Sequence, residues 1–369
     1  MIIGIPTEIK AQEYRISMIP SSVKELTGRG HRVLVQSGAG EGSNYTDELY
    51  SAVGAEIVAS AEQVFEQCEL IVKVKEPQAS EMSMITEKHT LFTYLHLAAD
   101  KKLTEALLAT GCTAIAYETI EVNKRLPLLE PMSEIAGRMS AIIGAYYLAK
   151  HNGGRGVLLG GVPGVVPGRV VVIGGGTAGV NAARVATGIG AEVSILEVDL
   201  ERMRFLDIAM EGCHTIYSNE ANLADLLPRA DLVIGAVLVR GAKAPKLITR
   251  EMLKIMQTGS VFVDIAVDQG GCAETTRPTT HDDPTFYEEG VLHYCVANMP
   301  GAYARTSSQA LNNSTQHWTT MIADHGVAEA CKIQPDLLGG INCIKGKLTC
   351  PPVAEAYGIE ASDAKLLLG

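Results

Sequence analysis

Short apolar runs alternate with amphipathic stretches over the first 130 residues of the chain. The amphipathic stretches, such as residues 20–30 and 100–111, repeat apolar positions with the spacing of a helix. Apolar runs bounded by glycine, proline or charge are typical of strands. We predict strands at residues 2–6, 31–36, 56–60, 70–75, 90–97 and 113–120. Such alternation indicates a parallel sheet with helices on both faces.

The same alternation returns after a connecting segment. Residues 132–151 have the pattern of one long helix that Ser133 caps, and residues 153–168 hold too many glycines and prolines for a regular element. Further strands are predicted at residues 170–174, 192–197, 214–218, 231–237, 260–267 and 292–298. After Pro300 the pattern is helical without a new strand series, so we expect this tail to pack on the first domain.

A glycine pattern lies where the strand at 170–173 must turn into a helix. Gly174, Gly176 and Gly179 have the G-x-G-x-x-G spacing, which allows a tight turn, lets backbone N–H groups reach a pyrophosphate, and brings the helix close. Glu197, at the end of the next strand, lies where an acid accepts hydrogen bonds from a ribose. With 37 glycines in the chain, the motif alone is also compatible with a structural turn, but its strand–helix–acid context predicts NAD binding.

The domain organisation follows from this motif. A chain of 369 residues exceeds the usual size of one core. We predict an α/β protein of two doubly wound parallel-sheet domains joined by the long helix. In this prediction a Rossmann NAD-binding domain, about 131–299, is inserted into a Rossmann-like substrate domain made of residues 1–130 plus about 300–369.

Charge and cysteine usage narrow the class of protein. The net charge is -11 and no block of like charge occurs, so nucleic acid and membrane surfaces are not expected partners. The N-terminus lacks a signal-peptide pattern, no apolar run is long enough to span a membrane, and eight cysteines are scattered without paired spacing. We expect a cytoplasmic enzyme with reduced thiols. No metal motif, nucleophile elbow or P-loop occurs, and adjacent Asp324 and His325 are not expected to hold a cation.

Four polar residues fall at predicted strand ends, where ligands of parallel sheets bind. Arg15 follows the first strand and its loop, Lys75 and His96 lie at the ends of two further strands of the first domain, and Asp268 closes a strand of the second. Each has a simpler interpretation: solvated cations for Arg15 and Lys75, a buried histidine for His96, a turn cap for Asp268. Because all four lie at strand ends, we favour the interpretation that they form one catalytic site across an interdomain cleft.

Several blocks of the sequence together resemble alanine dehydrogenases, over essentially the whole chain up to about residue 330. They are IGIPTEIKAQEYR, KVKEP, LFTYLHLAA, AYET, PMSEIAGR, GGRGVLLGGVPGV, DLVIGAVL, VDIAVDQGGC and VANMPGA. The resemblance implies reversible oxidative deamination of L-alanine to pyruvate and ammonium with NAD, by a homo-oligomer, a hexamer or trimer. It implies that Arg15 and Lys75 hold the substrate, that His96 is the acid/base, and that Asp268 is the second catalytic group.

The resemblance also implies a set of cofactor contacts beside the three glycines. These are Ser133, Thr177, Ala178, Glu197, Arg202, Ser218, Val237, Leu238, Ile265, Ala266, Val267, Asp268, Arg277, Val296, Ala297, Asn298 and Met299. Glu197 and Arg202 stand where relatives carry Asp and Lys, and Arg240 stands where a proline is expected.

Two other functions remain open at this point. A saccharopine-type dehydrogenase would need a roomier cleft for a longer substrate, and turnover of lysine-derived substrates would reveal it. A non-catalytic NAD(H)-binding subunit of a transhydrogenase would need a membrane partner chain, and oxidation of alanine by the purified protein alone would exclude it.

Overall fold

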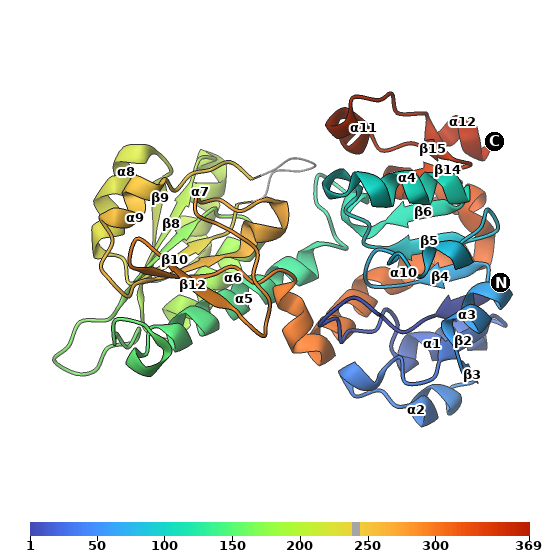
Figure 1. The fold of residues 1–369 in the computed structure, drawn as a ribbon, viewed down its shortest axis with the longest axis horizontal. Helices are drawn as coiled ribbons and strands as arrows, with labels where there is room; N and C mark the ends of the chain where they lie inside the picture. The colour runs from blue at the N-terminus through green and yellow to red at the C-terminus, as the bar shows by residue number, and fades with distance from the viewer. Residues whose placement is uncertain (238–243) are drawn as a thin grey trace. The chain divides into compact units, whose positions relative to one another are not determined.

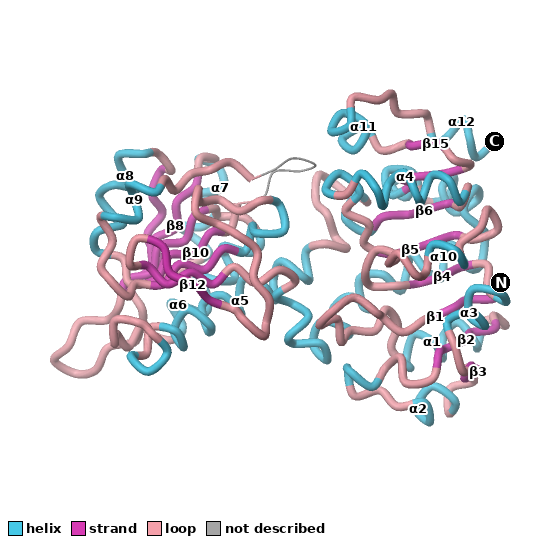
Figure 2. The backbone as a smooth tube through the Cα atoms, viewed as in Figure 1, coloured by secondary structure: helices cyan, strands magenta, loops and turns pink. Residues whose placement is uncertain are grey.

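The computed structural model describes residues 1–237 and 244–369, which form two compact units. Residues 1–132 and 301–369 make unit 1, and residues 133–300 make unit 2 (Figure 1). Each unit is a sheet flanked by helices, with strands in magenta and helices in cyan in Figure 2. The predicted fold class, α/β with two largely parallel sheets, is confirmed. No helix in the described ranges has the length and apolarity needed to cross a bilayer.

The sheet of unit 1 has the order β15-β14-β6-β5-β4-β1-β2-β3 among the described residues. Its parallel strands are β1 (Ile2–Ile5), β2 (Arg32–Gln36), β3 (Glu56–Val58), β4 (Leu70–Val72), β5 (Thr90–Thr93) and β6 (Thr113–Ala116). The chain runs outward from β1 to β3 on one side and from β4 to β6 on the other. The strand order therefore reverses between β1 and β4, which is where doubly wound sheets bind ligands.

The tail of unit 1 contributes strands that the sequence pattern did not predict. β14 (Ile341–Ile344) pairs antiparallel with β6, and β15 (Lys347–Leu348) pairs antiparallel with β14. These strands are short, and β14 finds its partner more than 200 residues earlier in the chain, so no local alternation marks it. The sequence analysis expected a helical tail without a new strand series and did not anticipate these two strands. Leu348, Cys350 and Val353 of this tail pack into the same core as Leu91 and Ala114.

The helices of unit 1 begin and end where local signals place them. Pro20 occupies the first turn of its helix, and Asp100 caps another by accepting from the Leu103 N–H at 3.1 Å. The helices are α1 (Pro20–Gly28), α2 (Asp47–Ser51), α3 (Ala61–Gln67), α4 (Lys101–Thr110), α10 (Ala304–Ile333), α11 (Pro351–Tyr357) and α12 (Ala364–Leu368). The long α10 contains a break at Gly326, whose φ is 73°.

The sheet of unit 2 has the described order β12-β13-β11-β10-β7-β8-β9. Its strands are β7 (Arg169–Ile173), β8 (Glu192–Glu197), β9 (Cys213–Tyr217), β10 (Leu232–Gly235), β11 (Val261–Asp264), β12 (Thr285–Glu288) and β13 (Val291–Tyr294). All are parallel except β12, an edge strand that the sequence analysis missed. It forms a hairpin with β13 through Glu289 and Gly290, whose φ values of 50° and 80° match a two-residue turn with both central residues left-handed.

Both faces of this second sheet are buried at its centre, along β7, β10 and β11. Along β7, Val170 and Val172 face one apolar cluster, and Val171 and Ile173 face another. Helices α5 (Glu130–Tyr147) and α6 (Thr177–Gly188) contribute side chains to the first cluster. Helices α8 (Glu220–Leu226) and α9 (Arg250–Lys254) contribute side chains to the second. Helix α7 (Leu200–Ala209) follows β8. This arrangement explains why the strands read as continuous apolar runs.

Helix α5 differs in detail from its prediction. It begins at Glu130 and ends at Tyr147, and a 3-10 turn over Lys150–Asn152 follows. Ser133 therefore lies inside the first turns of the helix, so its prediction as the helix cap was wrong. The cause is Pro131, which suits a first turn and lets the helix start one residue before it.

Candidate functional site

The predicted cofactor residues of unit 2 gather at one edge of its sheet. Because β13, β11, β10, β7, β8 and β9 are parallel, their carboxyl ends share that edge. The segments that follow these ends hold Gly174 to Gly179, Glu197, Ser218, Val237, the stretch 265–268 and the stretch 296–299. Leu238 and Arg240, named in the sequence analysis, lie outside the described residues. The edge is centred on β7, between β10 and β8, where the strand order reverses.

The glycine motif has the geometry that its spacing predicts. Gly174 adopts a φ of 103°, and a Cβ there would lie 2.7 Å from the Ala236 carbonyl oxygen on the neighbouring strand end. Gly176 caps α6, and a Cβ there would meet nothing within 4 Å. A Cβ on Gly179 would lie 1.8 Å from the Gly174 oxygen. The loop thus leaves the N–H groups at the start of α6 open to an anion, which is the requirement for a pyrophosphate.

Glu197 and Arg202 hold this loop from the side. Glu197 accepts from the Gly175 N–H at 2.8 Å with one oxygen and from the Val198 N–H at 2.7 Å with the other. Arg202 donates from Nε to the Gly175 carbonyl at 2.7 Å. Both peptide groups of Gly175 are therefore fixed. A carboxylate accepts about four hydrogen bonds, so Glu197 retains capacity for a ribose hydroxyl.

Asp268 is not the cap of its turn. The 3-10 helix Ile265–Gln269 after β11 is capped by the buried Asp264, which accepts from Ala266 N at 3.0 Å and from Cys272 N at 2.9 Å. Burial raises the pKa of Asp264, and these hydrogen bonds oppose the rise. Asp268 is exposed and accepts from the Asn298 N–H at 3.4 Å. Capping the turn was the simpler interpretation of Asp268, and Asp264, four residues earlier, has that role instead.

Further residues predicted to contact the cofactor are held in place by contacts within unit 2. Asn298 has a φ of 62°, and the N–H of Ala297 donates to Thr279 at 3.1 Å. The Arg277 guanidinium lies 4.0 Å from the Phe286 ring centroid, a cation–π contact. The Ser218 N–H donates to the Glu197 carbonyl at 2.9 Å, which places Ser218 beside the end of β8.

Arg15 of unit 1 is buried against an acid. Only 2% of it is exposed, and its Nε donates to Glu13 Oε1 at 2.6 Å while Nη2 pairs with the other oxygen. Nη1 lies 3.0 Å from the Met132 sulfur. This bidentate pair fixes the plane of the guanidinium. Arg15 is therefore a rigid donor and not the solvated loop cation of the simpler interpretation.

Lys75 follows β4 and is held through its backbone. Its N–H donates to Glu8 Oε2 at 3.3 Å, and its carbonyl accepts from Thr93 Oγ1 at 2.9 Å. Glu8 also accepts from Val74 N at 2.6 Å and pairs with the buried Lys73 at 3.3 Å. Burial raises the pKa of the Glu8 carboxyl, Lys73 opposes the rise and Glu13 adds to it. Lys75 is buried as well, so a solvated cation is again excluded.

His96 follows β5 and projects from a left-handed backbone. Its φ and ψ are 50° and 37°, and 45% of its side chain is exposed. The imidazole stacks on the Tyr94 ring at 5.8 Å with an interplanar angle of 5°. Burial raises the pKa of Tyr94, and nearby Arg15 opposes the rise. His96 is thus not a buried core histidine.

Arg15, Lys75 and His96 lie at one edge of the unit 1 sheet. They follow β1, β4 and β5, which are consecutive in the sheet and parallel, and the strand order reverses between the first two. Asp268 belongs to unit 2, where it lies among the predicted cofactor residues. Each unit therefore carries polar groups at the edge where parallel sheets bind ligands.

Two family models match the chain: Alanine dehydrogenase/PNT, N-terminal domain, over residues 4–136, and Alanine dehydrogenase/PNT, C-terminal domain, over residues 140–351. The chain belongs to the alanine dehydrogenase/PNT family. It is 53% identical to an alanine dehydrogenase of Mycolicibacterium smegmatis over 100% of both chains. The resemblance read from the sequence blocks is confirmed.

Two solved structures are also similar to the chain. An L-alanine dehydrogenase superimposes with a TM-score of 0.93 at 48% identity, covering 97% of this chain and 99% of that one. A transhydrogenase from Sinorhizobium meliloti gives 0.80 at 26% identity, covering 95% of this chain and 99% of that one. The chain is thus more similar to the dehydrogenase than to the transhydrogenase.

Sequence reasoning missed the acids that accompany these groups in this family member. Glu8 and Glu13 lie in the loop after β1, and Glu118 lies after β6, at the same edge as His96. Their signal was present, because acids also stand at predicted strand ends. The sequence does not show which acid contacts which cation, because the partners are separated by as few as two residues for Arg15 and Glu13 and by as many as 67 for Lys75 and Glu8.

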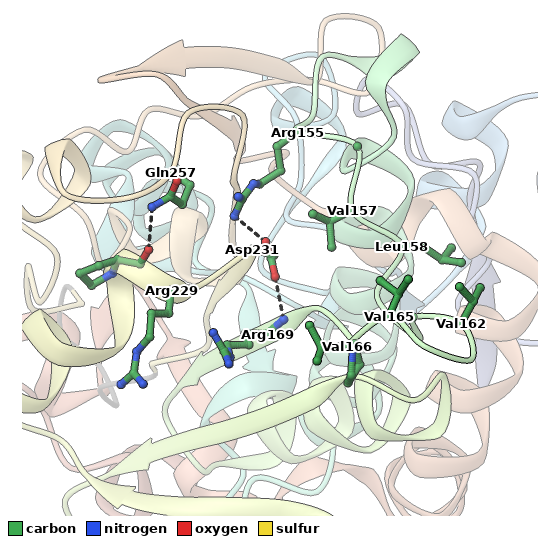
Figure 3. A pocket seen from close by; sticks show the side chains of 14 residues that line it. Arg155, Val157, Leu158, Val162, Val165, Val166, Arg169, Arg229, Asp231 and Gln257 are labelled. Atoms are coloured by element: carbon green, nitrogen blue, oxygen red, sulfur yellow. Dashed lines mark hydrogen bonds and ion pairs between the residues drawn. The ribbon is translucent and has the colours of Figure 1, made fainter.

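A cavity of about 570 Å³ lies at the other edge of the unit 2 sheet (Figure 3). Arg169 begins β7, whose opposite end leads to Gly174, and Asp231 precedes β10. Asp231 accepts from Arg155 Nη1 at 2.6 Å and from the Arg169 N–H at 2.8 Å, as the dashed lines show. Since ligands of parallel sheets bind at carboxyl ends, this cavity is not the cofactor site.

The described residues offer no group of three side chains suited to a metal ion. Asp324 pairs with His31 at 2.8 Å and with Arg29 at 2.9 Å, and the hydrogen bond from His31 lowers its pKa. This carboxylate is thus engaged by two side chains of unit 1.

Proposed function

We propose that this protein is an NAD-dependent L-alanine dehydrogenase. It would convert L-alanine, NAD+ and water to pyruvate, ammonium, NADH and a proton, reversibly. The observation that carries the proposal is the 53% identity to an alanine dehydrogenase over the whole of both chains. The polar groups at the carboxyl edges of both sheets are compatible with this chemistry.

The carboxyl edge of the unit 2 sheet fits a dinucleotide. The positive φ of Gly174 and the open space at Gly176 leave a cradle at the start of α6, whose N–H groups and helix dipole would hold the pyrophosphate. Glu197 would accept from the adenosine ribose. When bound, NAD+ accepts the hydride from the substrate carbon. The chain supplies binding, orientation and exclusion of water.

Arg15 and Lys75 would hold the substrate carboxylate and the carbonyl oxygen of pyruvate. Arg15 is fixed in its plane by Glu13, so substrate would meet an oriented pair of N–H donors. Lys75 offers a compact ammonium group, and hydrogen bonds to Glu8 and from Thr93 fix its backbone N–H and carbonyl. Groups held in this way lose little freedom when the substrate binds.

His96 and Asp268 would handle the protons. Oxidation of the amine gives an imine, water adds to it, and the carbinolamine releases ammonia. His96, half-exposed on the Tyr94 ring, would take the proton from the attacking water and return it to the leaving group. Asp268, an exposed carboxylate, would hydrogen-bond the amine or the carbinolamine oxygen of the same substrate.

We further propose a cytoplasmic homo-oligomer, a hexamer or trimer. The segment 153–168 exposes Leu158, Val162, Val165 and Val166, the last at 80%. Contiguous exposed apolar groups are typical of protein interfaces. All eight cysteines lie in the described ranges and are free, which agrees with a reducing compartment.

The test is NADH absorbance when the purified protein, with no other chain, meets L-alanine and NAD+. We expect turnover with L-alanine and little with lysine-derived substrates. His96→Ala protein should still bind NADH but turn over L-alanine about 100-fold more slowly, or slower still. A protein that binds NADH but oxidises no amino acid would contradict the proposal and favour the transhydrogenase-subunit alternative.

A further inference from the structure

The backbone of His96 adopts a conformation that its residue type disfavours. A φ of 50° places Cβ close to the following carbonyl, and non-glycine residues persist there only where their surroundings impose it. On the C-terminal side, the His96 carbonyl accepts from the Ala99 N–H at 3.0 Å, which starts the 3-10 helix Leu97–Ala99. Something must also fix the N-terminal side.

The Glu118 carboxylate performs that function. Its Oε1 accepts from the His96 N–H at 2.6 Å and from the Leu95 N–H at 3.1 Å, and its Oε2 lies 3.3 Å from the Leu95 nitrogen. Two successive N–H groups that converge on one anion form a concave anion site. Bonds to an ionised acceptor are about twice as strong as neutral ones.

Glu118 comes from the neighbouring strand. It lies in the 3-10 turn Tyr117–Thr119 after β6, which pairs with β5 in register Thr93 to Ala116. Its side chain is 13% exposed, and its Oε1 is 3.9 Å from His96 Nδ1, too far for a direct hydrogen bond. The hydrogen bonds of the carboxylate therefore go to the backbone of Leu95 and His96 and not to the imidazole ring.

We propose that Glu118 is a positioning residue for His96: it clamps the end of β5 in the left-handed conformation that aims the imidazole. The proposal rests on the proposed function, in which His96 transfers protons. Without the clamp, residue 96 relaxes to negative φ, and the ring leaves its stack on Tyr94. A displacement of about 1 Å at a reacting group costs up to roughly 100-fold in rate.

The experiment compares Glu118→Ala, Glu118→Gln and the double variant Glu118→Ala/His96→Ala with the wild type and His96→Ala. We expect Glu118→Ala to lower kcat about 10- to 100-fold with unchanged NADH affinity. Glu118→Gln keeps a side-chain acceptor for the two N–H groups, so its loss is smaller. In the His96→Ala background, Glu118→Ala costs nothing further, because the group it positions is gone.

A matched control is Glu69→Gln. Glu69 is an exposed carboxylate that accepts a backbone N–H, that of Ile2 at 3.1 Å, before β4 at the opposite edge of the same sheet. It should leave kcat unchanged. A crystal structure of Glu118→Ala provides a readout besides activity, and we expect φ of His96 to become negative.

Three results would overturn the proposal: wild-type kcat in folded Glu118→Ala, an additive loss in the double variant, or an unchanged φ at His96. If Glu118→Ala does not fold, full loss of kcat in folded Glu118→Gln would also contradict it. An inactive wild type would instead contradict the proposed function, so the two failures are distinguishable.

Discussion

At the scale of single residues, the cations of unit 1 are held by acids. Arg15 pairs with a buried Glu13, and the backbone N–H of Lys75 donates to Glu8, whose side chain is 3% exposed. The Arg15 guanidinium neutralises Glu13 directly. Its removal would therefore leave a buried acid without its counter-ion.

Lys75→Ala should raise KM for L-alanine while NADH binding changes little. Arg15→Ala should damage substrate use in the same way but also destabilise the fold by about 3–5 kcal/mol, because Glu13 is left buried without its counter-ion. Substrate kinetics, NADH fluorescence titration and thermal unfolding measure the three quantities. Loss of NADH binding in folded Lys75→Ala would contradict the division of labour between the units.

His96 and Asp268 are predicted to act as one catalytic group. His96→Ala should lower kcat about 100-fold or more, the scale of a positioned acid/base, and Asp268→Asn should also lower it. Because Asp264 caps the turn, Asp268→Asn should leave Tm unchanged. The double variant should be scarcely worse than the poorer single variant. Independent, additive losses would show that the two groups serve separate steps.

Glu197 should make the enzyme prefer NAD+ to NADP+. The carboxylate lies beside the glycine loop, where it would accept from the adenosine ribose and would repel a 2′-phosphate. We expect higher kcat/KM with NAD+ in steady-state kinetics. Equal or better efficiency with NADP+ would mean that Arg202 or Arg204 pairs with the phosphate instead.

At the scale of elements, the cofactor edge depends on how closely α6 approaches the end of β7. Gly179→Ala places a methyl group against the Gly174 oxygen, where 1.8 Å is available, so the start of α6 must shift. We expect NADH affinity to fall at least tenfold and Tm to decrease. Fluorescence titration and thermal unfolding test both.

Gly188→Ala is the matched control in the same helix. A Cβ at Gly188 meets nothing within 4 Å, and alanine favours the helix over glycine by up to about 1 kcal/mol. It should keep NADH affinity and slightly raise Tm. Equal loss of affinity in both variants would show that packing at the glycine loop is not the cause.

At the scale of the whole molecule, the apolar segment 153–168 is the surface we expect to be covered by another copy of the chain. Val165→Asp and Val166→Asp place charge on two of its most exposed apolar positions and should reduce the mass measured by light scattering. Ile359→Asp, at another exposed apolar position, should not. A monomeric wild type would contradict the oligomer, and unchanged mass in both valine variants would exclude this surface.

The sequence by itself determined the twelve parallel strands and the glycine motif. The central strands, such as β7 and β10, are buried on both faces, so each appears as an apolar run that needs no partner to be recognised. The placement of Arg15, Lys75, His96 and Asp268 at carboxyl ends follows from strand order alone. Their catalytic roles stay predictions.

Only the tertiary structure decided the edges of the sheets and the partners of the polar groups. β12, β14 and β15 are short and antiparallel, and β14 is defined by pairing with a distant β6. Glu118 reaches His96 from the next strand, and Asp264 rather than Asp268 caps its turn. A hydrogen bond between residues far apart in the chain leaves no periodic trace, because its geometry exists only once the strands have paired.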